Sequence, residues 1–188
     1  MPKTGYYKPW YIASGILILT GGVLMFTVDA HTSPARVYGY SMLVAIGTGL
    51  TAQSAYSVTP VKVAMDARYG PGMIPDAIGF INIAQIGSMV HALAIAGAIF
   101  QNLAFQYLRH ALEGKGFTDA ELHSAISGTQ SQLLASVSGE VKALAVNAII
   151  KAIDRVYILV IVAGVVCLIV SVPMRMEKLF IKASAASK

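Results

Sequence analysis

The chain carries little charge for its length. Of its 188 residues, 12% are Asp, Glu, Lys or Arg, against roughly 25% in soluble globular proteins. None of these residue types occurs in the runs 11–28, 37–58, 77–108 and 156–174, of which the shortest has 18 residues. A helix of that length rises about 27 Å, close to a hydrocarbon core of about 30 Å. The shortage of charge therefore excludes an ordinary soluble domain.

The uncharged runs predict α-helices rather than membrane strands, because their apolar residues are continuous and do not alternate with a period of two. We expect an all-α, polytopic membrane protein that forms one membrane domain over residues 1–188. Its spans should cover about 11–28, 37–58, 77–105 and 156–174, with an outer loop at 106–155.

Cysteine and intramembrane carboxylates are also scarce. Cys167 is the one cysteine, which excludes an internal disulfide and indicates a small buried apolar side chain. The uncharged runs contain no Asp or Glu, and the histidines lack metal-ligand spacing with one another or with Cys167. We therefore expect no enzyme activity, no metal site and no cofactor. Because the net charge of +5 comes mainly from the chain ends, we also expect no nucleic-acid partner.

Basic residues are divided unequally between the two sides that these spans would create. One side has Arg36 in a short loop, and the other has eight basic residues: Lys3, Lys8, Lys62, Arg68, Arg175, Lys178, Lys182 and Lys188. The positive-inside rule predicts that both termini are cytoplasmic. We expect the plasma membrane, with a vacuolar or other internal membrane as the alternative. Cleavage of the first run as a signal peptide is disfavoured by its length and by the interfacial aromatic residues Trp10 and Tyr11.

Small residues distinguish the two middle runs, because such residues at four-residue spacing let helix backbones approach closely. In the second run Ser41, Ala45 and Gly49 have this spacing, with Gly47 as a further small residue, and in the third run Ala84, Ser88, Ala92 and Ala96 have it. The first and fourth runs are bulky and aliphatic. We therefore expect the second and third helices to form an interior pair, and the first and fourth to face the lipid bilayer.

The expected outer loop contains two helix signals. Thr118 with Glu121 is a capping box, which predicts the start of a short helix. Ser138 with Glu140 is a second N-cap signal. One apolar face follows it, formed by Val141, Leu144, Ala148 and Ile149. This second amphipathic helix either lies on the membrane surface or runs straight into the fourth span.

A few uncharged polar side chains stand at membrane depth: Gln53, Asn82, Gln85 and His91. Polar residues there are costly and suggest a substrate path. The alternative for Asn82 and Gln85 is hydrogen bonding between helices. Gln53 fits hydration near the membrane surface almost as well as a substrate path. His91 fits a structural neutral histidine better than a proton path.

Several short motifs resemble, in their order, one family of transporters. They are GYYKPW at 5–10, YGYS at 38–41, GTG at 47–49, IGFINIAQIG at 78–87 and AGAIFQN at 96–102. Together they are similar to the last four helices of the fungal fourteen-spanner drug:proton antiporters of the major facilitator superfamily.

This resemblance implies that the chain is the C-terminal four-helix portion of a toxin or multidrug efflux pump. Such a pump exports small amphipathic organic substrates in exchange for protons, and the remaining transporter helices would be its partners. The middle two of these four helices would line the cavity. The alternative is a stand-alone four-helix membrane protein that acts as an interaction or scaffold partner without transport activity.

Overall fold

The computed structural model describes residues 6–126 and 139–176. Within these ranges, long α-helices account for most of the chain. The elements are α1 (Lys8–Phe26), α2 (Pro34–Met65), the short 3-10 helix η1 (Pro71–Met73), α3 (Ile74–Ala111), α4 (Asp119–Ile126) and α6 (Gly139–Ser171). The expected all-α class is thus observed in the part of the chain that the structure describes.

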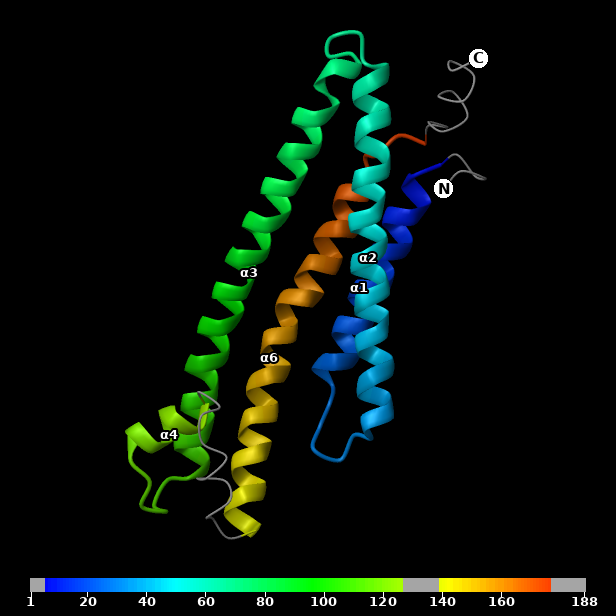
Figure 1. Ribbon diagram of the computed structural model, residues 1–188. Helices are drawn as coiled ribbons and strands as arrows, with labels where there is room; N and C mark the ends of the chain where they lie inside the picture. Colours follow the sequence, from blue (N-terminus) through cyan, green and yellow to red (C-terminus); the bar gives the residue numbers. More distant parts are fainter. Residues whose placement is uncertain (1–5, 127–138, 177–188) are drawn as a thin grey trace.

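The four long helices alternate in direction, as Figure 1 shows. The Lys8 Nζ donates a hydrogen bond to the carbonyl oxygen of Val172 at 2.8 Å, so the start of α1 lies beside the end of α6. The connection between α2 and α3 lies at this same end, whereas α4 and the turn between α1 and α2 lie at the other (Figure 1).

Local sequence explains where the long helices begin. A proline occupies the first turn of each of α1, α2 and α3, where its missing N–H leaves no helical hydrogen bond unmade. Gly70 has a φ of 67° immediately before η1, a conformation that glycine adopts at little cost. In α3, Asp76 in the first turn and Arg109 in the last complement the helix dipole.

The tightest packing runs along α1, which lies against both α2 and α6. A Cβ added to Gly164 of α6 would come within 2.7 Å of the backbone nitrogen of Leu19 in α1. A Cβ on Gly47 of α2 would come within 2.7 Å of Ile18 Cγ1. These glycines therefore let three backbones approach one another more closely than larger residues permit.

A group of small polar side chains lies in the same region. The buried Ser14 hydroxyl of α1 donates to the carbonyl oxygen of Gly47 at 2.7 Å and also bonds the Thr51 hydroxyl of α2. Cys167 of α6 lies 4.0 Å from the Thr51 oxygen and 3.8 Å from the carbonyl oxygen of Tyr11. Cys167 is half-buried between the three helices, in keeping with a packing role.

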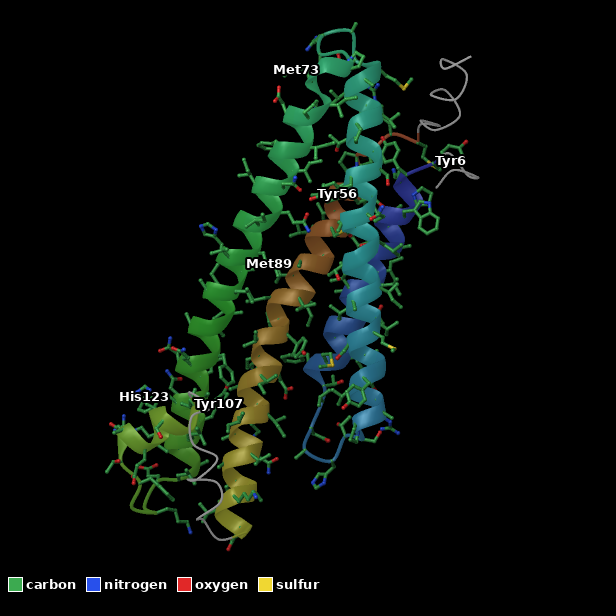
Figure 2. All side chains as sticks on the ribbon, in the orientation of Figure 1. Tyr6, Tyr56, Met73, Met89, Tyr107 and His123 are labelled. Atoms are coloured by element: carbon green, nitrogen blue, oxygen red, sulfur yellow. The ribbon has the colours of Figure 1, made fainter. Side chains whose placement is uncertain are left out.

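A separate apolar cluster joins α3, α4 and α6 at the far end of the molecule. Its buried members are Leu108, Leu112, Leu122, Ala145 and Ala148. Phe105 of α3 stacks on His123 of α4, with ring centroids 4.3 Å apart; Figure 2 labels His123 there.

The predicted capping box of α4 is confirmed. The backbone N–H and the hydroxyl of Thr118 both donate to Glu121 Oε2 at 2.8 Å, and the helix begins at Asp119. These bonds lower the pKa of the Glu121 carboxyl, because they favour its charged form.

The flanking helices continue into the expected outer loop, 106–155. α3 continues to Ala111, and α6 begins at Gly139 and is one continuous helix through the fourth apolar run. Of the two alternatives for the second amphipathic helix, the structure therefore shows the one that runs into the span. Packing explains the extensions, because Leu108 and Ala148 bury against each other's helices in the far-end cluster. Ser138 lies outside the described residues.

Among the described residues, three helical segments are long and apolar enough to cross a membrane: Lys8–Phe26, Pro71–Ala111 and Gly139–Ser171. The expected second span is α2, which has 32 residues but does not reach that apolarity. The difference follows from its sequence, since glycine, serine and threonine replace much of the aliphatic content that the other helices have.

Candidate functional site

A hydrogen-bonded cluster connects α2 to α3 in the half of the molecule that contains η1. The Tyr56 hydroxyl of α2 bonds Asn82 Oδ1 and also lies 2.8 Å from Gln85 Oε1, both on α3. Figure 2 labels Tyr56 on the side of α2 that faces α3. We call Tyr56, Asn82 and Gln85 the amide–phenol cluster.

The chemistry of the cluster is fixed by the single hydrogen of the phenol. Tyr56 can donate it fully to one amide oxygen at a time, and both Asn82 Oδ1 and Gln85 Oε1 lie against the hydroxyl. The NH₂ groups of the two amides are further donors, and their oxygens are further acceptors. The cluster can therefore accept from or donate to a neutral polar ligand without holding a charge.

The positions of these residues along their helices explain the geometry. Asn82 and Gln85 are three residues apart, which places them on similar sides of α3. Both are exposed, whereas Tyr56 is half-buried. The cluster is therefore covered by α2 on one side and is open on the other within this chain.

The structure does not bring Gln53 or His91 into this cluster. Gln53 is exposed on α2, and its backbone carbonyl accepts a hydrogen bond from the Ser57 hydroxyl at 2.8 Å. His91 is exposed on α3, and its Nδ1 lies 2.7 Å from the carbonyl oxygen of Gly87 in the same helix. Within the described residues, the recorded hydrogen bonds link neither side chain to another helix.

The small residues of α2 are divided between a packed and an open face. Gly47 is buried against α1, whereas Ala45 is exposed and Gly49 has no neighbouring atom within 4 Å of an added Cβ. Ser41 is exposed and donates to the carbonyl oxygen of Val37 at 2.9 Å, with a 3.9 Å contact to Met25 Sδ.

The small residues of α3 face outward in this chain. Ala84, Ser88 and Ala92 are exposed, and Ala96 is half-buried. The Ser88 hydroxyl donates to the carbonyl oxygen of Gln85 in its own helix at 2.9 Å. These residues therefore do not produce a close helix contact among the described elements.

The first and fourth helices, which were expected to face lipid, also pack closely against each other on one side. Gly15 and Gly22 of α1 have Leu168 and Ile161 of α6 within 3.2 Å of an added Cβ. The signal was present as glycines within bulky runs, but the aliphatic content around them concealed it. Tyr56 was also missed, because a tyrosine in an apolar run resembles an interfacial anchor.

Comparison with known proteins gives consistent matches over nearly the whole chain. It is 40% identical over 171 residues to the efflux pump patC of Aspergillus clavatus, a match that covers 91% of this chain and 30% of that protein. It is 35% identical over 185 residues to the efflux pump alnA of Emericella nidulans, covering 98% of this chain and 32% of the relative. The chain is homologous to part of the fungal efflux transporters of the major facilitator superfamily.

The homology fixes the class of protein and its environment. The efflux pump DEP3 of Alternaria brassicicola is a further relative, 31% identical over 95% of this chain. These relatives are transporters, not enzymes, as the sequence led us to expect. The homology and the long apolar helices make the chain an integral membrane protein. The chain spans about 30% of the length of these relatives. No protein-family model and no solved structure matches it.

Proposed function

We propose that the chain is the C-terminal four-helix portion of a transporter that exports small amphipathic organic compounds in exchange for protons. The observation that carries the proposal is the amide–phenol cluster, in a chain homologous to efflux pumps. The cluster offers both donors and acceptors at membrane depth. Amphipathic molecules of varied structure can be recognised by such groups, together with apolar walls, without a fixed charge.

We assign α2 as the fourth membrane span, although it is less apolar than the others. Its 32 residues rise about 48 Å, which exceeds the hydrocarbon core. Several of its hydroxyl groups are satisfied by carbonyl oxygens of the same helix, as when Ser54 donates to the carbonyl oxygen of Leu50 at 2.6 Å. In this arrangement Lys8, Lys62 and Arg175 lie on the cytoplasmic side, with both termini, and the plasma membrane is the proposed location.

The open faces of α2 and α3 are the proposed contact surface for the remaining helices of the transporter. On α3, Phe80 and Ile83 are 73% and 74% exposed, and no residue of its most apolar stretch is buried. Alternating access requires two helical halves that move around a site near the membrane midplane. The cluster would face that site, and the proton-coupling carboxylates would be supplied by the rest of the transporter.

The proposal is tested by replacing both amides in the whole-length transporter. Asn82→Leu with Gln85→Leu should reduce export of substrates rich in hydrogen-bonding groups by roughly fivefold for each lost hydrogen bond. Export of purely apolar substrates should change less, and protein abundance should stay near normal. Cellular accumulation of paired polar and apolar fluorescent substrates, normalised to abundance, measures this difference.

Asn102→Leu is the matched control, because it removes an amide of α3 that bonds only within its own helix, to the carbonyl oxygen of Ala98 at 2.8 Å. This control should leave the ratio of polar to apolar export unchanged. If the double variant instead lowers abundance and leaves export per molecule unchanged, the cluster only holds helices together. The 188-residue chain expressed alone should export neither substrate.

A further inference from the structure

A cavity of about 820 Å³ opens at the end of the molecule away from η1, between α1, α3 and α6. Its apolar wall includes Phe26 of α1, Tyr107 of α3 and Leu144 of α6. Its polar wall is mainly one face of α6, with Asn147, Lys151, Asp154 and Arg155. Asn147, Lys151 and Arg155 are four residues apart, and Asp154 follows Lys151 by three, so all four lie along one side of the helix. The cavity therefore has an apolar part and a charged part.

The cations of this cavity are not neutralised by a close ion pair. Within the described ranges, no carboxylate oxygen forms a salt bridge with Lys151 or Arg155, although Asp154 lines the same cavity and interacts electrostatically with Arg155. The Arg155 guanidinium instead lies over the Phe26 ring, 5.5 Å from its centroid, a cation–π arrangement that holds the charge at the apolar wall. Lys151 and Arg155 carry two positive charges and Asp154 one negative charge, so the lining of the cavity has an excess of one positive charge.

The depth of the cavity in the membrane limits which classes of ligand can reach it. Residues 156–174 contain no charged side chain, so Arg155 marks the point at which the helix leaves the hydrocarbon core. Lys151 lies one helical turn farther out, at the depth of lipid headgroups. Basic pockets between membrane helices bind anionic lipid headgroups, chiefly on the cytoplasmic side of membranes. This cavity lies at the opposite end in the topology proposed above, so its two cations, and not the charge of the leaflet, would select the headgroup.

We propose that this cavity binds a phospholipid with an anionic headgroup. Lys151 and Arg155 contact the phosphate, and the glycerol and upper acyl carbons lie against Phe26, Tyr107 and Leu144. A free phosphate ion has the same negative charge, but it has no apolar part that could contact Phe26, Tyr107 and Leu144. The site is separate from the amide–phenol cluster, which lies in the opposite half of the molecule, and it does not depend on the proposed transport function.

Native mass spectrometry of the purified 188-residue chain in detergent tests this site. The protein is titrated separately with phosphatidylglycerol, phosphatidylcholine and inorganic phosphate. Wild-type protein should bind phosphatidylglycerol more tightly than phosphatidylcholine, and should bind inorganic phosphate far more weakly than either lipid. Lys151→Gln with Arg155→Gln should weaken phosphatidylglycerol binding by roughly fivefold for each lost charge.

Two control variants keep the test decisive. Lys142→Gln removes an exposed cation of α6 that does not line the cavity and should leave phosphatidylglycerol binding unchanged. Lys151→Arg with Arg155→Lys keeps both charges and should retain the preference, so it separates lost charge from misfolding. The proposal is wrong if phosphatidylglycerol shows no preference, if Lys142→Gln weakens binding equally, or if inorganic phosphate binds as tightly as the lipid.

Discussion

α1 and α3 are both long and apolar enough to cross a membrane, but they are packed in opposite ways. In the most apolar stretch of α1, 33% of the residues are buried, compared with 0% in that of α3. The glycines show the same contrast, since Gly15, Gly21 and Gly22 of α1 lie against neighbouring helices. By contrast, Gly79, Gly87 and Gly97 of α3 have nothing within 4 Å of an added Cβ.

The difference shows that an apolar sequence indicates that a helix lies in a membrane but does not indicate which other helices pack against it. A helix surrounded by lipid has no need of small residues, because lipid tails adapt to any side chain. Small residues lower the distance between backbones, which matters where another helix lies alongside. The stripe of Ala84, Ser88 and Ala92 on α3 is therefore consistent with a surface that the rest of the transporter covers.

The largest expected effect comes from filling a packed glycine. Gly164→Ala places a Cβ within 2.7 Å of the Leu19 backbone and should lower the free energy of unfolding by about 1–3 kcal/mol through overpacking. Gly97→Ala on α3 meets open space and should leave stability unchanged, or raise it by up to about 1 kcal/mol through helix propensity. Denaturant unfolding of the chain in detergent measures both, and equal destabilisation would remove the contrast between the helices.

A smaller effect is expected from hydroxyl removal. Ser14→Ala deletes the bonds from α1 to Gly47 and Thr51 of α2, and hydrogen bonds between membrane helices average about 0.6 kcal/mol. Ser88→Ala is the control, because its hydroxyl bonds only a carbonyl of its own helix. We expect Ser14→Ala to lower the midpoint of unfolding and Ser88→Ala to leave it unchanged. A larger loss for Ser88→Ala would show that α3 has close partners within this chain.

The smallest effect concerns α4, which packs against the far end of α3. The lowered pKa of Glu121 means that its capping contribution is complete above the ordinary pKa of the carboxyl. That contribution is lost as pH falls through the lower pKa of the folded state. Hydrogen exchange of α4 amides, corrected for intrinsic rates, should show protection that falls at acidic pH. Glu121→Gln keeps an acceptor but cannot titrate, so this pH dependence should disappear, whereas Glu113→Gln should preserve it.

Sequence patterns predicted the helices well but their packed faces poorly. Uncharged runs located α1, α2, α3 and α6, and the capping box at Thr118 located α4. Both signals are local in the sequence. An uncharged run indicates a membrane environment for that segment, and a capping box depends on backbone N–H groups a few residues away. The sequence left open whether α6 would run into the fourth span and placed the end of α3 too early, because Leu108 and Ala148 come together only in the folded chain.

The packed faces depend on neighbours that are distant in sequence. Small residues occur on several sides of α2, and Gly47 is buried while Gly49 is not, although Gly49 belongs to the four-residue pattern and Gly47 does not. Asn82 and Gln85 were found because amides are unusual in apolar helices. Their partner Tyr56 was not found, because its hydroxyl is ordinary in an interfacial tyrosine and the bond to Asn82 joins residues 26 positions apart.

The central claim is that the open face of α3 is covered by other helices of the transporter, whereas the outer face of α1 remains in lipid. It is tested most directly by nitroxide labels at Ile86 of α3 and Ile16 of α1, which are 66% and 51% exposed, on a Cys167→Ala background. Collision of each label with dissolved oxygen is compared between the 188-residue chain and the whole-length transporter in the same membrane. We expect the rate of collision with oxygen to fall for the label at Ile86 in the whole-length protein and to stay unchanged for the label at Ile16. Equal oxygen collision at Ile86 in the two proteins would contradict it.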